Sequence, residues 1–180
     1  LGRYPTTTVF PKLQRPRGFI EVTGQNINTP VSPRYTIADF TSGHPARFPY
    51  YIALREDLVR KLELLTDLVQ AKGHQCDKLT VMSGFRSRAN RRRGSGRNSA
   101  HYYGGAADVF VDSNHDARMD DLNHDGEINR KDAQLLVSYV DELEERHPEL
   151  AGGAGWYRRT RSHGPFIHMD VRGERIRWHR

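Results

Sequence analysis

Apolar residues recur at helical spacing between Ala53 and Lys72, and Gly73 can end a helix there. The spacing predicts one amphipathic helix whose apolar stripe lies in the core. A second helix is expected from about Ala133 to Arg146, since a residue that precedes a proline, as in His147-Pro148, disfavours helical backbone. The stripe of the first helix consists of Leu54, Leu58, Leu62, Leu65, Leu68 and Val69.

Short apolar runs bounded by turn residues predict strands. The last two of these runs are joined by Arg172-Gly173-Glu174 and are expected to form a final pair, whereas Gly152, Gly153 and Gly155 are expected to form a flexible connection before them. Hairpin signals together with segregated helices favour an α+β fold with a small antiparallel sheet and helices packed on it. The expected strands are Leu79–Met82, Ala106–Val111, Phe166–Val171 and Arg175–Trp178.

Two segments stand apart from this periodic pattern. Residues 1–35 are rich in Pro, Thr and Gly and predict an extended N-terminal arm with one short strand-like run, Phe19–Val22. Residues 36–180 are expected to form the domain proper. Within it, residues 87–99 are almost free of apolar side chains and predict an exposed loop, and the aspartate-rich residues 112–132 predict an insertion.

Length and composition limit the class of protein. A chain of 180 residues with 36% hydrophobic and 28% charged residues suits one globular domain with a polar surface. Its apolar runs are far shorter than the ~20 residues that a membrane span requires. Cys76 is the only cysteine, so neither an intrachain disulfide nor a cysteine-based zinc cluster can form.

The net charge of +6 is concentrated in Arg86–Arg97 and in Arg172–Arg180. A polyanionic partner would suit these segments. Nucleic acid is disfavoured, because aromatic residues do not alternate with the arginines as they do in single-strand binding grooves. An anionic polymer of a cell wall would fit the positive charge of these segments equally well. The oligomeric state is not indicated by the sequence.

Candidate metal chemistry lies in two separate segments. Ser99–Asp108 contains His101 and Asp108 with glycines between them, and histidine and carboxylate are both zinc ligands. In Phe166–Val171, strand alternation places His168 and Asp170 on one face. Two histidines and one carboxylate would leave a fourth position for water, as a hydrolytic zinc requires.

Three motifs in this order carry a resemblance to a known family. They are Ser83-Gly84-Phe85-Arg86-Ser87, then Ser99-x-His101-x-x-Gly104-x-Ala106-x-Asp108, and then Phe166-Ile-His168-Met-Asp170. Together they resemble the zinc D-Ala-D-Ala carboxypeptidases, whose fold is shared by murein endopeptidases and Hedgehog signalling domains. The resemblance extends from about Val31 to Trp178. It implies that His101, Asp108 and His168 bind Zn²⁺ and that Arg86 binds substrate and stabilises the oxyanion.

The resemblance leaves the general base open. Many relatives have a glutamate three residues before the last histidine ligand, but Pro165 stands there in this chain. In another branch this role falls to a histidine five residues before the ligand, which is the position of His163, and a neutral imidazole can accept a proton from water. Asp170 could instead orient a zinc ligand without binding the metal itself.

The function implied is hydrolysis of a peptide bond in a peptidoglycan stem or cross-link, of the D-Ala-D-Ala carboxypeptidase or endopeptidase type. Such an enzyme would be periplasmic or secreted. The alternative is a non-catalytic, zinc-containing binding module of the same fold, which the proline at position 165 keeps open.

A second metal motif resembles an EF-hand or dockerin calcium loop. It offers oxygen ligands at the expected positions, with Gly126 at the sharp turn, and therefore predicts a structural Ca²⁺. The alternative is a solvated turn followed by a helix cap. The segment Asp112–Asp116 begins a similar pattern without the glycine, so a paired second site is disfavoured. The expected ligands are Asp121, Asn123, Asp125, Glu127, Asn129 and Asp132.

Overall fold

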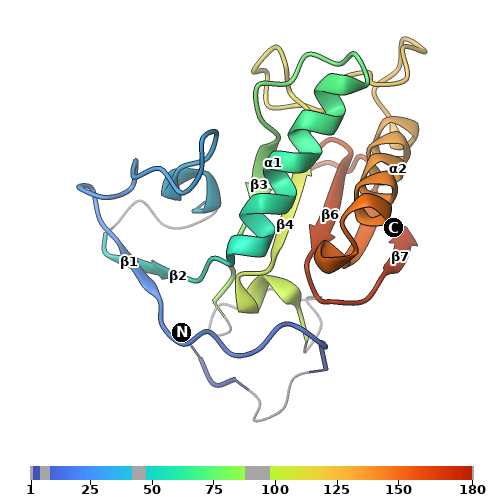
Figure 1. Ribbon diagram of the computed structural model, residues 1–180. Coiled ribbons are helices and arrows are strands. Elements are labelled where there is room, and N and C mark those ends of the chain that lie inside the picture. The colour runs from blue at the N-terminus through green and yellow to red at the C-terminus, as the bar shows by residue number, and fades with distance from the viewer. Residues whose placement is uncertain (1, 5–8, 42–47, 88–97, 180) are drawn as a thin grey trace.

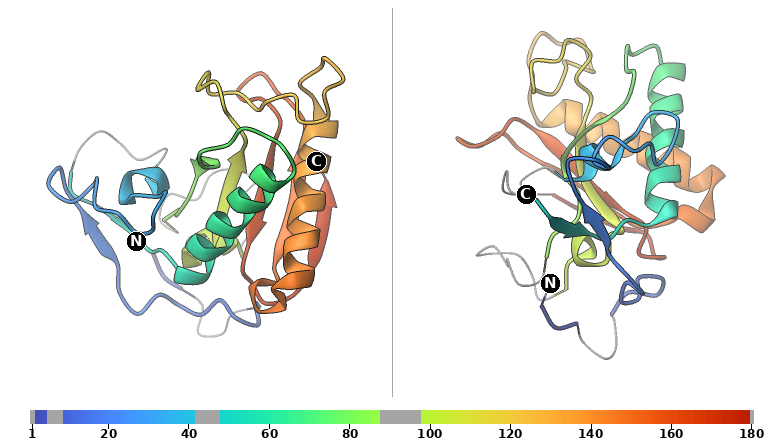
Figure 2. Two further views of the ribbon diagram at one scale, coloured as in Figure 1. Left: turned by 45° about the horizontal axis from the view of Figure 1, so that its top comes forward. Right: turned by 90° about the vertical axis from the view of Figure 1, so that its left-hand side faces the viewer.

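The computed structural model describes residues 2–4, 9–41, 48–87 and 98–179. It contains a two-stranded sheet, β1-β2, and a five-stranded sheet of order β3-β4-β6-β5-β7, and Figures 1 and 2 show α1 and α2 side by side on one face of the larger sheet. The predicted α+β class is confirmed. The elements are β1 (Ile20–Val22), η1 (Ile37–Phe40), β2 (Tyr50–Ile52), α1 (Glu56–Ala71), β3 (Thr80–Ser83), η3 (Ala100–Tyr103), β4 (Ala106–Phe110), α2 (Arg130–Arg146), η4 (Pro148–Leu150), β5 (Gly153–Tyr157), β6 (Phe166–Asp170) and β7 (Ile176–His179).

Helix α1 buries the predicted stripe apart from Leu54, which precedes the helix, and Leu58, Leu62 and Leu65 are fully inaccessible. It starts at Glu56, three residues later than predicted, because the backbone of Arg55 is extended. Helix α2 starts earlier than predicted, at Arg130. The side chain of Asn129 there accepts a hydrogen bond from the backbone of the first turn, which caps the helix.

The expected pairing of the two C-terminal runs is wrong. Strand β7 pairs in parallel with β5, and β5 lies between β6 and β7 in the sheet. Of the glycines expected to form a flexible connection, Gly153 and Gly155 lie in β5 and Gly152 directly precedes it. A Cβ on Gly152 would overlap the backbone of Asp170, and a Cβ on Gly155 would overlap the indole of Trp178, so close packing requires glycine at both positions.

The described part of residues 1–35 packs against the domain. Phe10 and Leu13 are buried, and the backbone amide of Lys12 donates to the carbonyl of Arg172 at 3.0 Å. Strand β1 pairs antiparallel with β2. Most of the loop predicted at 87–99 lies outside the described residues. Within the described ranges, no helix is long and apolar enough to cross a membrane.

Candidate metal centre

Three elements bring the predicted ligands together. Asp108 lies in β4 and His168 lies opposite it in β6, as direct partners in the antiparallel register. His101 lies in η3, the short helix just before β4. Gly104 ends η3 with φ 68°, and a Cβ there would overlap the backbone of Ala53, so the return of the chain into β4 requires glycine.

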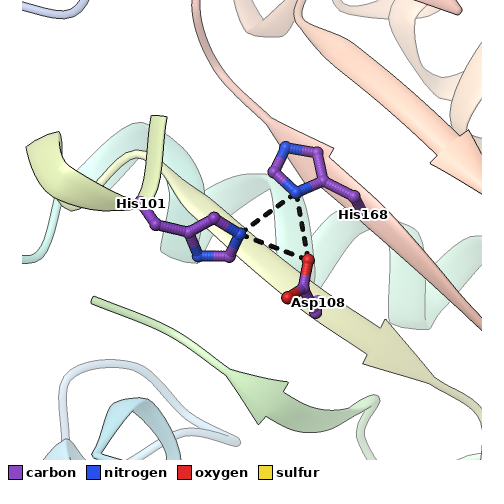
Figure 3. Close-up of side chains that lie close together, drawn as sticks. All are labelled: His101, Asp108 and His168. Carbon is purple, nitrogen blue, oxygen red and sulfur yellow. Dashed lines mark hydrogen bonds and ion pairs between the residues drawn. The ribbon is translucent and has the colours of Figure 1, made fainter. Parts of the chain in front are cut away.

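The donor atoms of the three side chains form a nearly equilateral triangle (Figure 3). His101 Nε2 lies 3.2 Å from Asp108 Oδ1 and 3.1 Å from His168 Nδ1, and His168 Nδ1 lies 3.0 Å from Asp108 Oδ1. Two ligands of a tetrahedral zinc ion with bonds of 2.0–2.1 Å are about 3.3 Å apart. The spacing of the donors therefore fits three ligands of one such ion. All three side chains are buried.

In each imidazole, the far nitrogen, which is the one that faces away from the other two donors, has a hydrogen-bond partner. His101 Nδ1 lies 2.7 Å from the carbonyl oxygen of Gly84, and His168 Nε2 lies 3.0 Å from Asp170 Oδ2. A carbonyl and a carboxylate can only accept, so these far nitrogens carry the protons. The nitrogens that face one another are then left with lone pairs, as metal ligands require.

The charges of the cluster are coupled. Burial alone would raise the pKa of Asp108, but the two histidines hold it well below its usual range. Burial lowers the pKa of His101, more than Asp108 raises it. Burial acts to lower the pKa of His168 as well, yet its bonds to Asp108 and Asp170 raise it overall. Asp108 is therefore ionised, and His101 is neutral near pH 7.

Arg86 follows β3 and reaches the cluster from the side. Its Nη2 donates to Asp108 Oδ2, and its Nε donates to Ser83 Oγ at 3.0 Å. Its side chain is 28% exposed, so the guanidinium is also open to solvent. A fixed positive charge beside a metal ligand is in a position to meet negative charge that develops on a substrate.

Asp170 supports His168 from a fully buried position. The Asp170 carboxylate accepts from the amide of Gly153 at 2.8 Å and from the guanidinium of Arg172 at 3.0 Å. Burial alone would raise the pKa of Asp170, but His168 and Arg172 hold it well below its usual range. The carboxylate is therefore ionised, and it fixes the orientation of the imidazole.

Three neighbours of the cluster were not identified from the sequence. Gly84 was noted only as part of a motif, and Arg172 only as part of a basic segment and of the joint between two predicted strands, yet they contact His101 and Asp170. The indole of Trp178 packs 5.2 Å from the imidazole of His168. The sequence offers little indication of the place of Trp178, because this place depends on the pairing of β7 with β5, and that pairing was not predicted.

His163 lies in the loop between β5 and β6, at the end of β6 remote from Asp170. Its Nδ1 is 2.8 Å from the carbonyl oxygen of Gly164, and its ring packs edge-on against Phe166. These described contacts do not include a residue of the metal cluster. Pro165 lines the same cleft of about 300 Å³ as His163.

The predicted calcium loop is closed by its own side chains. Asp121 Oδ2 accepts from the amide of Gly126 at 2.8 Å, and Asp125 Oδ1 accepts from the amide of Glu127 at 3.0 Å. Asp132 is fully buried; its Oδ1 accepts from the amide of Leu122 at 2.9 Å, and its Oδ2 caps α2. In the preceding loop, Asp112, Asn114 and Asp116 accept equivalent backbone bonds.

A buried cluster of two histidines and one aspartate on adjacent strands is the donor set of a three-ligand metal centre, and it could bind a metal ion. A family model described as Peptidase M15 matches residues 42–129. The match includes Arg86, His101 and Asp108 and ends before His168. It confirms the resemblance drawn from the motifs and supports a metallopeptidase. No curated protein and no solved structure matches the chain.

Proposed function

We propose that the protein is a zinc peptidase that hydrolyses peptide bonds in peptidoglycan stems or cross-links. The observation that carries this proposal is the triangle of donors at 3.0–3.2 Å, in which each far imidazole nitrogen is already committed to an acceptor. The family match adds the reaction class, because it identifies a peptidase. The peptidoglycan substrate rests on the resemblance of the sequence motifs.

His101, Asp108 and His168 would hold the ion. When bound, zinc supplies Lewis-acid polarisation of the scissile carbonyl and lowers the pKa of water. Arg86 would stabilise negative charge that develops on the carbonyl oxygen, since its guanidinium already lies beside Asp108. Asp170 would keep the His168 imidazole in the tautomer and orientation that binding needs.

His163 is proposed as the general base. A neutral imidazole there would accept a proton from the attacking water and return it to the leaving amine. Its described contacts are with Gly164 and Phe166, so these contacts do not hold the ring against a residue of the cluster. If His163 does not act, proton transfer would fall to water.

A non-catalytic zinc-binding module is the second candidate function. The observation that favours it is Pro165, which stands where many relatives have a catalytic glutamate. Both candidates would bind zinc through the same three side chains. Turnover, and not metal content, therefore separates them.

The decisive experiment is mass spectrometry of purified peptidoglycan incubated with the zinc-loaded protein, beside a chelator-treated sample. Zinc-dependent loss of terminal alanine would support a carboxypeptidase, and zinc-dependent opening of cross-links would support an endopeptidase. Intact peptidoglycan with stoichiometric zinc still bound would reject the peptidase and favour the binding module.

Variants assign the roles within the site. His168→Ala should lose zinc, whereas His163→Ala should keep zinc and lose turnover. His147→Ala is the matched control, since this histidine follows α2 and pairs only with Glu149 at the surface. If His163→Ala turns over substrate as fast as the control does, His163 is not the base.

We also propose a structural Ca²⁺ in the loop from Asp121 to Asp132. The loop already has a sharp turn at Gly126 with φ 84°, which suits oxygen ligands around a cation. Calcium should raise the thermal unfolding midpoint of the wild type and not of an Asp121→Ala variant. An equal rise in both would reject the site.

An exported location, periplasmic or secreted, follows from the proposed wall substrate. Cell fractionation with an antibody against the protein tests it, and recovery from the cytosol alone would contradict it.

A further inference from the structure

A concave site whose lining includes none of the three proposed metal ligands lies between the N-terminal segment and the junction of β2 and α1. It is a cleft of about 510 Å³ formed by residues 14–20, residues 52–55 and Tyr103. In Figure 1, the blue N-terminal segment runs below α1 and η3 before it enters β1. Tyr103 packs against Tyr4 and Phe10, whereas His101 of the same short helix contacts β4 and β6.

The lining of this cleft is strongly cationic. Arg15, Arg17 and Arg55 all contribute to it, and none of its described lining residues is an aspartate or a glutamate. Arg15 and Arg17 are exposed and form no ion pair with another described residue. Three guanidinium groups with no acid among them create a positive potential inside a concave surface, which attracts anions.

Two buried polar atoms of the cleft residues lack partners. Within the described part of the chain, Arg55 Nε and Tyr103 Oη are inaccessible to solvent and make no hydrogen bond. The other end of the Arg55 guanidinium is fixed, because its Nη2 donates to the carbonyl of Gln14 at 2.6 Å. Tyr103 is 2% exposed. Buried donors without partners are rare in native proteins, and a ligand is one of the standard explanations.

The charge of Arg55 is also incompletely balanced. Burial lowers the pKa of Arg55, and only the more distant charge of Asp57 acts in the opposite direction. An anion at the cleft would relieve this desolvation cost. A guanidinium and a phenol hydroxyl both donate to oxygen, and guanidinium groups match the geometry of carboxylate and phosphate oxygens.

We propose that this cleft is an oxyanion-binding site for a carboxylate or phosphate group, with Arg15, Arg17 and Arg55 as cationic contacts and the Tyr103 hydroxyl as a neutral donor. The site is distinct from the metal cluster and does not depend on peptidase activity. It is also joined to the segment between His101 and Asp108 by a backbone hydrogen bond, because the amide of Arg55 donates to the carbonyl of Gly104 at 3.0 Å.

The test is an NMR titration of backbone amides in the full chain with sodium phosphate and, separately, with sodium acetate, at constant ionic strength. Phenanthroline, an uncharged chelator, is present throughout to remove metal as a competing site. Saturable shifts at residues 14–20, 53–55 and 103 support the proposal for either ion. Tighter binding of phosphate would identify the natural ligand as phosphate-bearing, and tighter binding of acetate would identify it as carboxylate-bearing. Linear shifts, or shifts confined to other residues, overturn it.

Paired variants separate a built site from general charge attraction. Arg15→Gln with Arg17→Gln should weaken binding about tenfold or more, as expected for the loss of charge-assisted hydrogen bonds. The matched control, Arg146→Gln with Arg175→Gln, removes the same charge from exposed positions outside the cleft. If both double variants bind equally well, the proposal is overturned.

Tyr103→Phe supplies a readout that a purely structural role would not give. The hydroxyl has no hydrogen bond to lose to any described residue, so the thermal unfolding midpoint should stay the same or rise. Anion binding should nevertheless weaken by about fivefold, the value of one hydrogen bond. Unchanged affinity would overturn the role given to this hydroxyl.

Discussion

Replacing Lys61 with methionine should be among the most damaging single changes outside the metal cluster. Lys61 is fully buried, and its Nζ donates to Glu144 Oε1 at 2.6 Å and to the carbonyl oxygens of Leu150 at 3.0 Å and Asp170 at 2.8 Å. One ammonium thus joins α1 to α2, to η4 and to the end of β6. Methionine would keep an unbranched apolar side chain one atom shorter and would remove all three hydrogen bonds.

The loss in free energy of unfolding can be estimated from the groups that would lose their hydrogen-bond partner. Two buried carbonyl oxygens would lose a partner, at a cost of about 1–3 kcal/mol each. Glu144 would lose its cation but would keep bonds from the amide of Gly152 and from Arg177. Breaking a buried ion pair costs about 3–5 kcal/mol, and the remaining bonds of Glu144 place that part near 3 kcal/mol. With at least about 1 kcal/mol for each carbonyl, the total loss is about 5 kcal/mol. That is a large part of the 5–15 kcal/mol that stabilises a typical domain.

Urea unfolding followed by circular dichroism measures this loss. With a slope of about 2 kcal/mol per molar, the midpoint should fall by about 2.5 M. Arg60→Met is the matched control, because Arg60 is the preceding residue of α1 and pairs with Glu149 only at the surface, where such pairs are worth about 0–1 kcal/mol. A Lys61→Met midpoint no lower than that of the control would mean that the pair merely balances its own desolvation.

Three further predictions concern the surroundings of the metal cluster and the acid sensitivity of the fold. Asp170→Asn should weaken zinc binding about 10- to 100-fold in a chelator competition, because the imidazole loses its charged partner; unchanged affinity would contradict that role. Gly155→Ala should displace Trp178, seen as altered tryptophan fluorescence with weaker zinc binding, and a normal spectrum would refute the close packing. Burial alone would raise the pKa of Glu63, but hydrogen bonds, including those from Arg34, lower it. Its stabilising effect is therefore present above its unfolded pKa of about 4.3 and is lost as the pH falls through the folded value. Glu63→Gln should flatten the loss of stability between neutral and acidic pH, and an equally steep loss in the variant would refute this.

The grouping of the three proposed ligands could be predicted because three sequence motifs together resemble a known family, and strand alternation adds to that resemblance. Alternation along a strand places His168 and Asp170 on one face, and the direct pairing of β4 with β6 brings Asp108 opposite His168. The strands themselves were visible as apolar runs. Geometry within one strand is local information, which a sequence retains.

The surroundings of the site could not be predicted, because they depend on which strands become neighbours. Strand β5 is rich in glycine and carries little apolar signal, so it was interpreted as a connection. Its insertion beside β6 changes the sheet order and brings Trp178 to His168. Non-local pairing of this kind has no periodic signature along the chain.

Lys61 is a buried polar residue whose burial the sequence pattern does indicate. It lies three positions after Leu58 and four before Leu65, which is within the apolar stripe of α1. A charged residue on a core face implies a buried partner, since an unpaired charge there is too costly. The sequence could not identify that partner, because Glu144 lies on another helix 83 positions away.

The same network explains how the metal ligands keep their register. Asp170 is held through its carbonyl by Lys61 and through its carboxylate by Gly153, and its neighbour Gly152 leaves no room for a Cβ. A slip of β6 by one residue would turn His168 to the opposite face of the sheet. Because Asp170 is fixed on both its backbone and its side chain, β6 cannot slip without breaking buried bonds. The precision of the ligand triangle therefore derives from residues on α1 and β5 that contact none of its donor atoms.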